Sequence, residues 1–155
     1  LQICGLIGRL RHENTSKHGT EMKQDPTKDG LQMSIDGVLT EYAVSKVLNL
    51  NFDLNCEYRK FDADLTSAKG NKIDVKSTKK IGGNLNAVLW SNSKPADIYV
   101  LTEIWPTFIN VVGWVSRDDF IKDENIINVG NGNFYSMPQS QLFSFDYDKR
   151  RKTIL

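Results

Sequence analysis

Hydrophobic residues recur at helical spacing in residues 36–50. Side chains three or four positions apart share one side of an α-helix, so this pattern predicts a helix with one buried face. Asp36 is suited to be its N-cap, and Glu41 falls on the flank of the apolar stripe. The stripe itself consists of Val38, Leu39, Tyr42, Ala43, Val47 and Leu50.

Residues 72–78 alternate between polar and apolar side chains, which is typical of a strand with two different faces. Asp74 and Lys76 share one of these faces because they are two positions apart. A shorter strand-like run at 63–66 precedes them, and the turn-forming segment 67–71 separates the two runs. We therefore expect a β-hairpin.

The pattern predicts two further strands, a short helix and one mixed strand-like run. Residues 97–104 are nearly continuously apolar at their centre, as in a strand buried on both faces, and 108–115 form a partner strand. Residues 116–122 predict a short helix capped by Ser116. The short run 56–61 is a mixed, strand-like segment.

This order of elements predicts an α/β fold with a mixed central sheet flanked by helices. We expect one domain over residues 31–155, preceded by a charged and polar arm or lead-in at 1–30. Residues 85–90 form an element whose type the pattern leaves open. The last thirty residues are rich in asparagine and are expected to form loops.

The composition limits the range of partners. With 155 residues and a net charge of +1, the whole-molecule field favours neither acidic nor basic partners, so attraction to nucleic acid requires a local patch. No segment approaches the length of a membrane-spanning helix, which is about 20 apolar residues, and the first eight residues do not resemble a secretory signal. Cys4 and Cys56 are expected to be reduced thiols in a cytoplasmic protein.

The hairpin brings acidic groups together. Asp64 lies ten positions before Asp74, so a turn centred near Lys69 sets the two opposite each other. Asp62 is a rival for Asp64, but it points to the other face of a regular strand.

Two such carboxylates repel each other unless a positive charge neutralises them. Hard oxygen ligands without sulfur or imidazole favour Mg²⁺, with Mn²⁺ as a substitute. Lys76 on the same face could hold an attacking water or stabilise charge on a phosphate, and the preceding helix can bring in Glu41. These residue types predict phosphodiester hydrolysis.

The order Glu41 on a helix, Asp64 on one strand and Asp74 and Lys76 on the next resembles the PD-(D/E)XK nuclease superfamily. The phrase at residues 70–78, GNKIDVKST, is similar to the hairpin of that superfamily's motif. The resemblance implies a restriction-endonuclease-like fold, with a helix, three strands, a helix and a strand as its core. It also implies Mg²⁺-dependent cleavage of DNA.

By this resemblance Asp64 and Asp74 are metal ligands, Glu41 is a further ligand, direct or through water, and Lys76 positions the attacking water. The superfamily includes structure-selective members similar to Holliday-junction resolvases, and it allows a homodimer in the cytoplasm of a bacterial or phage-infected cell. No helix is recognisable between Thr78 and Asp97, so we expect an elaborated loop or a degenerate helix there.

The region around the hairpin is locally basic. Residues 56–80 contain seven Lys and Arg against four Asp and Glu, a net charge of +3, which attracts phosphates. The nucleic-acid contacts expected from this segment are Lys60, Lys69, Lys72, Lys79 and Lys80.

Two other interpretations remain open. A non-catalytic nucleic-acid-binding protein could keep the same fold and basic face without cleaving DNA. Alternatively, Asp64, Asp74 and Lys76 could be ordinary cross-strand ion pairs in a structural or interaction subunit, each contributing less than about 1 kcal/mol.

Overall fold

The computed structural model describes residues 2–18, 29–58, 62–130 and 132–145. Its helices are α1 (Gln2–Lys17), α2 (Gly30–Leu48) and the short α3 (Arg117–Phe120). The strands are β1 (Leu65–Thr66), β2 (Lys72–Thr78), β3 (Leu85–Val88), β4 (Ile98–Ile104), β5 (Ile109–Ser116), β6 (Ile126–Asn128) and β7 (Asn133–Met137). Three short 3₁₀ helices are η1 (Leu89–Ser93), η2 (Asp123–Asn125) and η3 (Gln139–Gln141).

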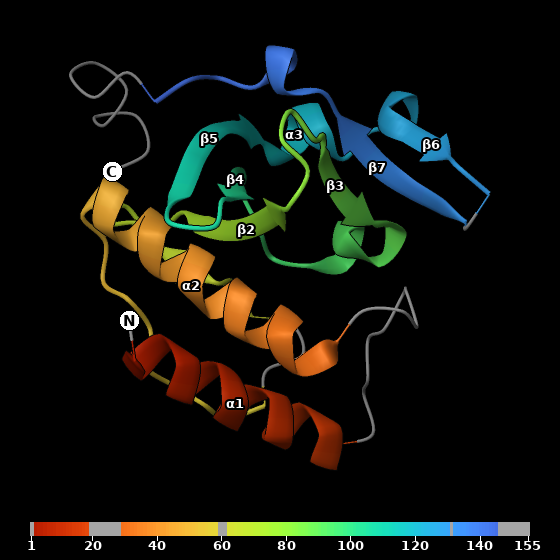
Figure 1. Cartoon of the computed structure of the whole chain (residues 1–155). Coiled ribbons are helices and arrows are strands. Elements are labelled where there is room, and N and C mark those ends of the chain that lie inside the picture. The colour runs from red at the N-terminus through yellow and green to blue at the C-terminus, as the bar shows by residue number, and fades with distance from the viewer. Residues whose placement is uncertain (1, 19–28, 59–61, 131, 146–155) are drawn as a thin grey trace.

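The strands form two sheets. The larger has the order β1-β2-β4-β5 and is mixed, because β2 and β4 run parallel while the other neighbours are antiparallel. The smaller is antiparallel with the order β3-β7-β6. Helix α2 covers one face of the larger sheet, α1 packs on the outer side of α2, and the smaller sheet lies beyond the opposite face (Figure 1). The α/β class and the mixed sheet are confirmed.

Helix α2 begins earlier than the sequence pattern predicts. Its N-cap is Asp29, whose side chain accepts a hydrogen bond from Leu31 N at 2.9 Å. Asp36 lies inside the helix and is buried, so its prediction as the N-cap is wrong. At the other end Asn49 adopts φ 54°, the left-handed conformation that asparagine tolerates at the end of a helix.

The face of the larger sheet beneath α2 is apolar. Val44 and Leu48 of α2 pack on Ile73 of β2 and Val100 of β4, and Leu65 of β1 joins this cluster. Since neighbouring strands in register point their side chains the same way, the residues between these positions on β2 must point away from α2. The sheet alternation therefore sends Asp74 and Lys76 to the opposite face.

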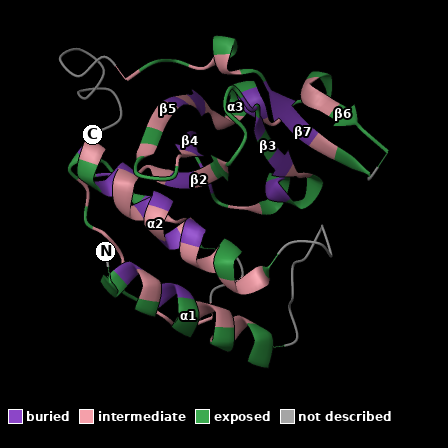
Figure 2. Cartoon of the chain, in the orientation of Figure 1, coloured by how far each residue is buried: buried purple, intermediate pink, exposed green. Residues whose placement is uncertain are grey.

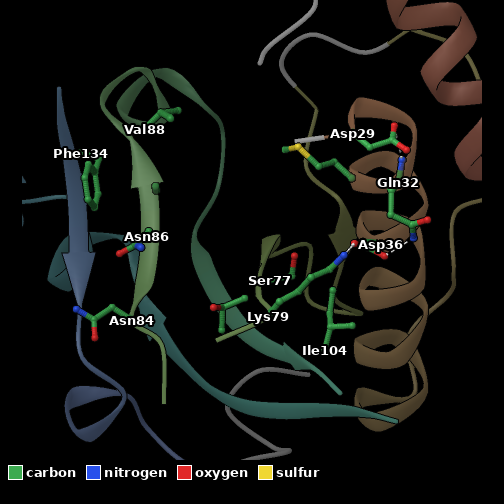
Figure 3. A pocket seen from close by; sticks show the side chains of 13 residues that line it. Asp29, Gln32, Asp36, Ser77, Lys79, Asn84, Asn86, Val88, Ile104 and Phe134 are labelled. Carbon is green, nitrogen blue, oxygen red and sulfur yellow. Dashed lines mark hydrogen bonds and ion pairs between the residues drawn. The ribbon is translucent and has the colours of Figure 1, made fainter. Parts of the chain in front are cut away.

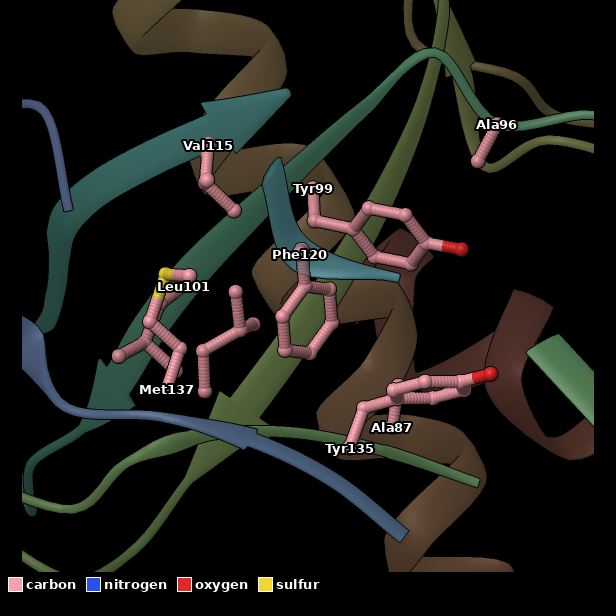
Figure 4. Packing of buried hydrophobic residues seen from close by; sticks show 9 residues of the cluster. Ala87, Ala96, Tyr99, Leu101, Val115, Phe120, Tyr135 and Met137 are labelled. Carbon is pink, nitrogen blue, oxygen red and sulfur yellow. The ribbon is translucent and has the colours of Figure 1, made fainter. Parts of the chain in front are cut away.

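The opposite face carries an aromatic core (Figure 4). Tyr99 of β4 meets Phe120 of α3 edge to face, with ring centroids 5.0 Å apart. Tyr135 and Met137 of β7 close this core from the smaller sheet. The residues that line it come from both sheets, which explains why the smaller sheet stays in place over the larger one.

The expected lead-in is wrong for the residues that form α1. Cys4 and Ile7 are buried against Val38 of α2, whereas the outer side of α1 is exposed (Figure 2). Both cysteines are free thiols, and burial raises the pKa of Cys4. Residues 19–28 lie outside the described part of the chain.

The central strand predictions are confirmed. Residues predicted at 97–104 and 108–115 form β4 and β5, and the Ser116 hydroxyl accepts a hydrogen bond from Asp119 N as the cap of α3. The segment between Thr78 and Asp97, expected to be an elaborated loop or a degenerate helix, holds the strand β3 and the 3₁₀ helix η1.

Two other predictions need correction. The C-terminal region is not all loop, because it supplies β6 and β7. Residues 56–58 of the run predicted at 56–61 are not a strand, and 59–61 lie outside the described residues.

Candidate functional site

The hairpin brings Asp64 and Asp74 together as predicted. β1 pairs with β2 so that Leu65 lies opposite Ile73, and Asp64 N, just before β1, donates to Ile73 O at 3.1 Å. This places the Asp64 carboxyl within reach of the charge of Asp74. Gly70 makes the turn possible with φ 86°, a conformation that favours glycine. Both carboxylates thus occupy the face of the sheet that points away from α2.

Asp64 also has a structural role at the edge of β2. Asp64 immediately precedes β1, and its Oδ2 accepts a hydrogen bond at 2.7 Å from Val75 N, which lies beyond the residues of β2 that pair with β1. Asp62, the rival for Asp64, is exposed, and its Oδ1 accepts a hydrogen bond from the adjacent Ala63 N. Asp64 itself is half-buried.

Asp74 is the centre of a compact group of charges. Its side chain is 0% exposed and forms ion pairs with two lysines, Lys76 through Oδ2 and Lys94 through Oδ1, the latter at 2.8 Å. Lys76 and Lys94 keep 24% and 15% of their side-chain surface exposed, so both ammonium groups are largely but not fully buried beside Asp74. We call Asp64, Asp74, Lys76 and Lys94 the ion cluster.

The pKa values of the two carboxyl groups in the ion cluster are shifted in opposite directions. Burial raises the pKa of Asp64, and the neighbouring charge of Asp74 raises it further. Burial alone would also raise the pKa of Asp74, but the ammonium groups of Lys76 and Lys94 outweigh it, and the net pKa is lowered. Of the two carboxyl groups, Asp64 is therefore the one that takes up a proton more readily.

Lys94 is a member of this site that sequence analysis missed. It follows η1 in the connection between β3 and β4, and its backbone oxygen accepts a hydrogen bond from Arg117 Nη1 at 2.7 Å. Burial lowers the pKa of Lys94, but Asp74 and Asp64 outweigh this and raise it above its usual value. No local pattern distinguishes Lys94 from any other loop lysine, because only the crossover brings it to β2.

Glu41 has a different setting from the expected one. It is buried on α2, and its Oε2 accepts a hydrogen bond from Arg11 Nη1 of α1 at 2.7 Å. Arg11 also donates to the backbone oxygens of Asp53 and Asn55, so it ties both helices to the loop after α2. The Glu41 charge still acts on Lys94, whose pKa it helps to raise.

The expected metal ligands do not form one three-carboxylate group. Within residues 2–18, 29–58, 62–130 and 132–145, no set of three or more His, Cys, Asp or Glu side chains is arranged to hold a metal ion. Asp64 and Asp74 alone supply facing carboxylates, and their all-oxygen donor set fits a hard cation such as Mg²⁺. In the structure, the ammonium groups of Lys76 and Lys94 neutralise the Asp74 carboxylate.

The lysines expected to contact nucleic acid lie at both ends of β2. Lys69 and Lys72 are at the β1–β2 turn, whereas Lys79 and Lys80 follow the other end of the strand. Seven strand steps separate Lys72 from Lys79, a span of about 23 Å with the ion cluster between them. Lys60 lies outside the described residues.

A groove of about 580 Å³ lies between the N-terminal half of α2 and the smaller sheet (Figure 3). Lys79 reaches across it to Asp36, with Nζ 2.6 Å from Oδ2. Asn84, just before β3, and Asn86 of β3 line the opposite wall, and the apolar side chains of Met33, Ile104 and Phe134 also line the groove. Such a lining combines polar and apolar surface next to the end of β2.

No protein-family model, curated protein or solved structure matches this chain. Among the described residues, no helix has both the length and the apolar character needed to cross a membrane.

Proposed function

We propose that this protein is a Mg²⁺-dependent nuclease that hydrolyses phosphodiester bonds in DNA. The observation that carries the proposal is the facing pair Asp64 and Asp74, with Lys76 on the same face of β2 and paired to Asp74. Two carboxylates that could hold a cation and one ammonium group beside them are residue types that metal-assisted hydrolysis uses.

The order of elements supports a restriction-endonuclease-like fold within this proposal. Helix α2 is followed by the β1–β2 hairpin and then by β4, which lies parallel to β2. The connection between β2 and β4 contains β3 and η1 where the superfamily has a helix. This departure leaves the hairpin unchanged, and it supplies Lys94 to the ion cluster.

Each residue has a defined role in the proposed reaction. Asp64 and Asp74 would hold the cation, which when bound supplies positive charge for water activation and for the phosphate oxygens. Lys76 donates a hydrogen bond to the attacking water and orients it in line with the scissile bond. Glu41 acts from α2 through its charge, held in place by Arg11.

A cleavage assay tests the proposal. Purified protein with Mg²⁺ is incubated with single-stranded, duplex, forked and four-way DNA, and the products are separated on a gel. We expect cleavage that stops in EDTA and falls by at least about a hundredfold in Asp74→Asn and Lys76→Met. Retention of full cleavage by either variant would overturn the proposed site.

A matched control separates loss of chemistry from loss of charge at the surface. Asp118→Asn removes an exposed carboxylate on α3, outside the ion cluster, and is expected to cleave like the wild type.

The comparison of branched with linear DNA tests whether the enzyme is structure-selective, as in resolvases. Light scattering of the purified protein tests for the homodimer, and cell fractionation tests for the cytoplasmic location.

A second candidate is a nucleic-acid-binding protein that does not cleave DNA. It is favoured by the neutralisation of Asp74 by two lysines and by the lack of a third ligand within the described residues. This protein would bind DNA equally in EDTA and in Mg²⁺, and Asp74→Asn would leave that affinity unchanged. The same gel and a binding titration distinguish the two candidates.

A further inference from the structure

Hydrogen bonds to the backbone of Lys94 hold this residue next to Asp74. Its backbone oxygen accepts from Arg117, and its own N–H donates to Ser91 O at 3.1 Å. The Nζ lies 2.8 Å from Asp74 Oδ1 and 5.4 Å from the centroid of the Trp90 ring, which is itself partly exposed. The amine thus fills one side of the Asp74 carboxylate and is screened from solvent by an indole.

The ion cluster is balanced in charge without any bound ion. Its two carboxylates and two ammonium groups sum to zero when all four are ionised. A divalent cation at Asp64 and Asp74 would leave two excess positive charges in a largely buried site, where like charges repel strongly. A phosphodiester carries one negative charge and would remove part of that excess.

We propose that Lys94 makes cation binding depend on the phosphodiester substrate. In the free protein Lys94 occupies Asp74 and opposes the cation, and a DNA phosphate beside the site compensates the added charge. Cation and DNA therefore bind cooperatively, and Lys94 sets the strength of the coupling. This inference rests on the proposed function and specifies how its two ligands are linked.

Titrations of the whole protein measure the coupling. Mn²⁺ binding is followed by calorimetry without DNA, and DNA binding is followed by fluorescence anisotropy in EDTA and in Ca²⁺, with DNA integrity checked on a gel. In the wild type we expect weak Mn²⁺ binding alone and at least about a fivefold gain in DNA affinity with Ca²⁺, which is within the usual range of coupling between two sites.

Two neutral variants test the role of Lys94. Lys94→Met removes the charge and keeps the length, and Lys94→Gln also keeps a donor for Asp74, which guards against loss of folding. In both we expect Mn²⁺ to bind about tenfold tighter without DNA, and the gain in DNA affinity with Ca²⁺ to shrink correspondingly. Lys94→Arg keeps the charge and should keep the wild-type coupling.

Lys122→Met is the matched control, because Lys122 is an exposed lysine whose partner is the exposed Asp119. It should behave like the wild type in every titration. Unchanged Mn²⁺ affinity in both neutral variants, or independent binding of cation and DNA to the wild type, overturns the inference while cleavage still supports the nuclease. Absence of cation binding to the wild type with and without DNA instead overturns the proposed function itself.

Discussion

Gly8 of α1 lies so close to Ile35 of α2 that a β-carbon at Gly8 would come within 2.7 Å of Ile35 Cα. The neighbour is backbone, which cannot rotate away as a flexible side chain can. The two helices therefore approach closely only because residue 8 lacks a side chain. This contact, together with the Arg11–Glu41 ion pair, fixes α1 on the outer side of α2.

Gly8→Ala is expected to destabilise the protein by about 1–3 kcal/mol, because the methyl group forces the helices apart. Gly5→Ala is the matched control, since a β-carbon there meets nothing within 4 Å. In the same helix Gly5→Ala should stabilise the fold by about 0.5–1 kcal/mol, through the lower backbone entropy of the unfolded chain. Urea unfolding measures both, and equal signs for the two variants would contradict the close packing.

Asp74→Ala is expected to lower the free energy of unfolding by about 3–5 kcal/mol, because it leaves two partly buried ammonium groups without their shared counter-charge. Asp118→Ala, on the exposed side of α3, should change stability by no more than about 0.5 kcal/mol. Thermal and urea unfolding in EDTA check the difference without any contribution from a cation. A wild-type unfolding curve for Asp74→Ala would show that the ion pairs add nothing to folding.

Glu103 gives the protein a defined acid dependence. Hydrogen bonds from Gln139 and Gly82 lower its pKa to about 2, against an ordinary value of 4.5, with smaller contributions from Asn110 and Trp105. A lowered pKa in the folded state means that the stabilisation is present above pH 4.5 and is lost as the pH falls toward 2.

Glu103→Gln should therefore cost about 1–3 kcal/mol at pH 7, and the difference from the wild type should shrink as the pH falls below about 4. Unfolding curves recorded between pH 7 and pH 2 check this. The exposed Glu124→Gln serves as the control and should follow the wild type throughout. A difference that stays constant with pH would contradict the carboxylate's role.

DNA binding should depend on salt through the lysines at the ends of β2. Lys80→Gln is expected to weaken DNA binding in EDTA and to reduce the slope of log affinity against log salt by about 0.9, the effect of one lost phosphate contact. Lys122→Gln, which alters an exposed lysine paired with Asp119 outside the ion cluster, is the control and should leave the slope unchanged. Anisotropy titrations at several salt concentrations measure the slope.

The part of the site that could be predicted is the part encoded by local pattern. Alternation along residues 72–78 fixes which side chains share a face, and the turn with Gly70 fixes which residue of the preceding strand lies opposite Asp74. Both properties depend on neighbours within about ten positions. The facing of Asp64 and Asp74 was therefore predictable before any coordinates.

The rest of the site depends on contacts between distant segments. Lys94 reaches Asp74 only because β4 returns parallel to β2, which no local sequence pattern indicates. The burial of Glu41 results from α1, and α1 itself was missed because its buried stripe of Cys4, Ile7 and Gly8 is narrow and lies among polar residues. The position of Lys94, the burial of Glu41 and the placement of α1 all depend on tertiary packing.

The position of β7 between β3 and β6 has a consequence for biosynthesis. β3 obtains its partner strand from a segment about fifty residues later in the chain, because Leu85 pairs with Met137. A nascent chain that has emerged only as far as α3 holds the hairpin and Lys94 but still lacks Tyr135 and Met137, so its aromatic residues face water. On the ribosome, the ion cluster is therefore synthesised before β7, and β3 can pair with its neighbouring strand only after residue 137 has emerged.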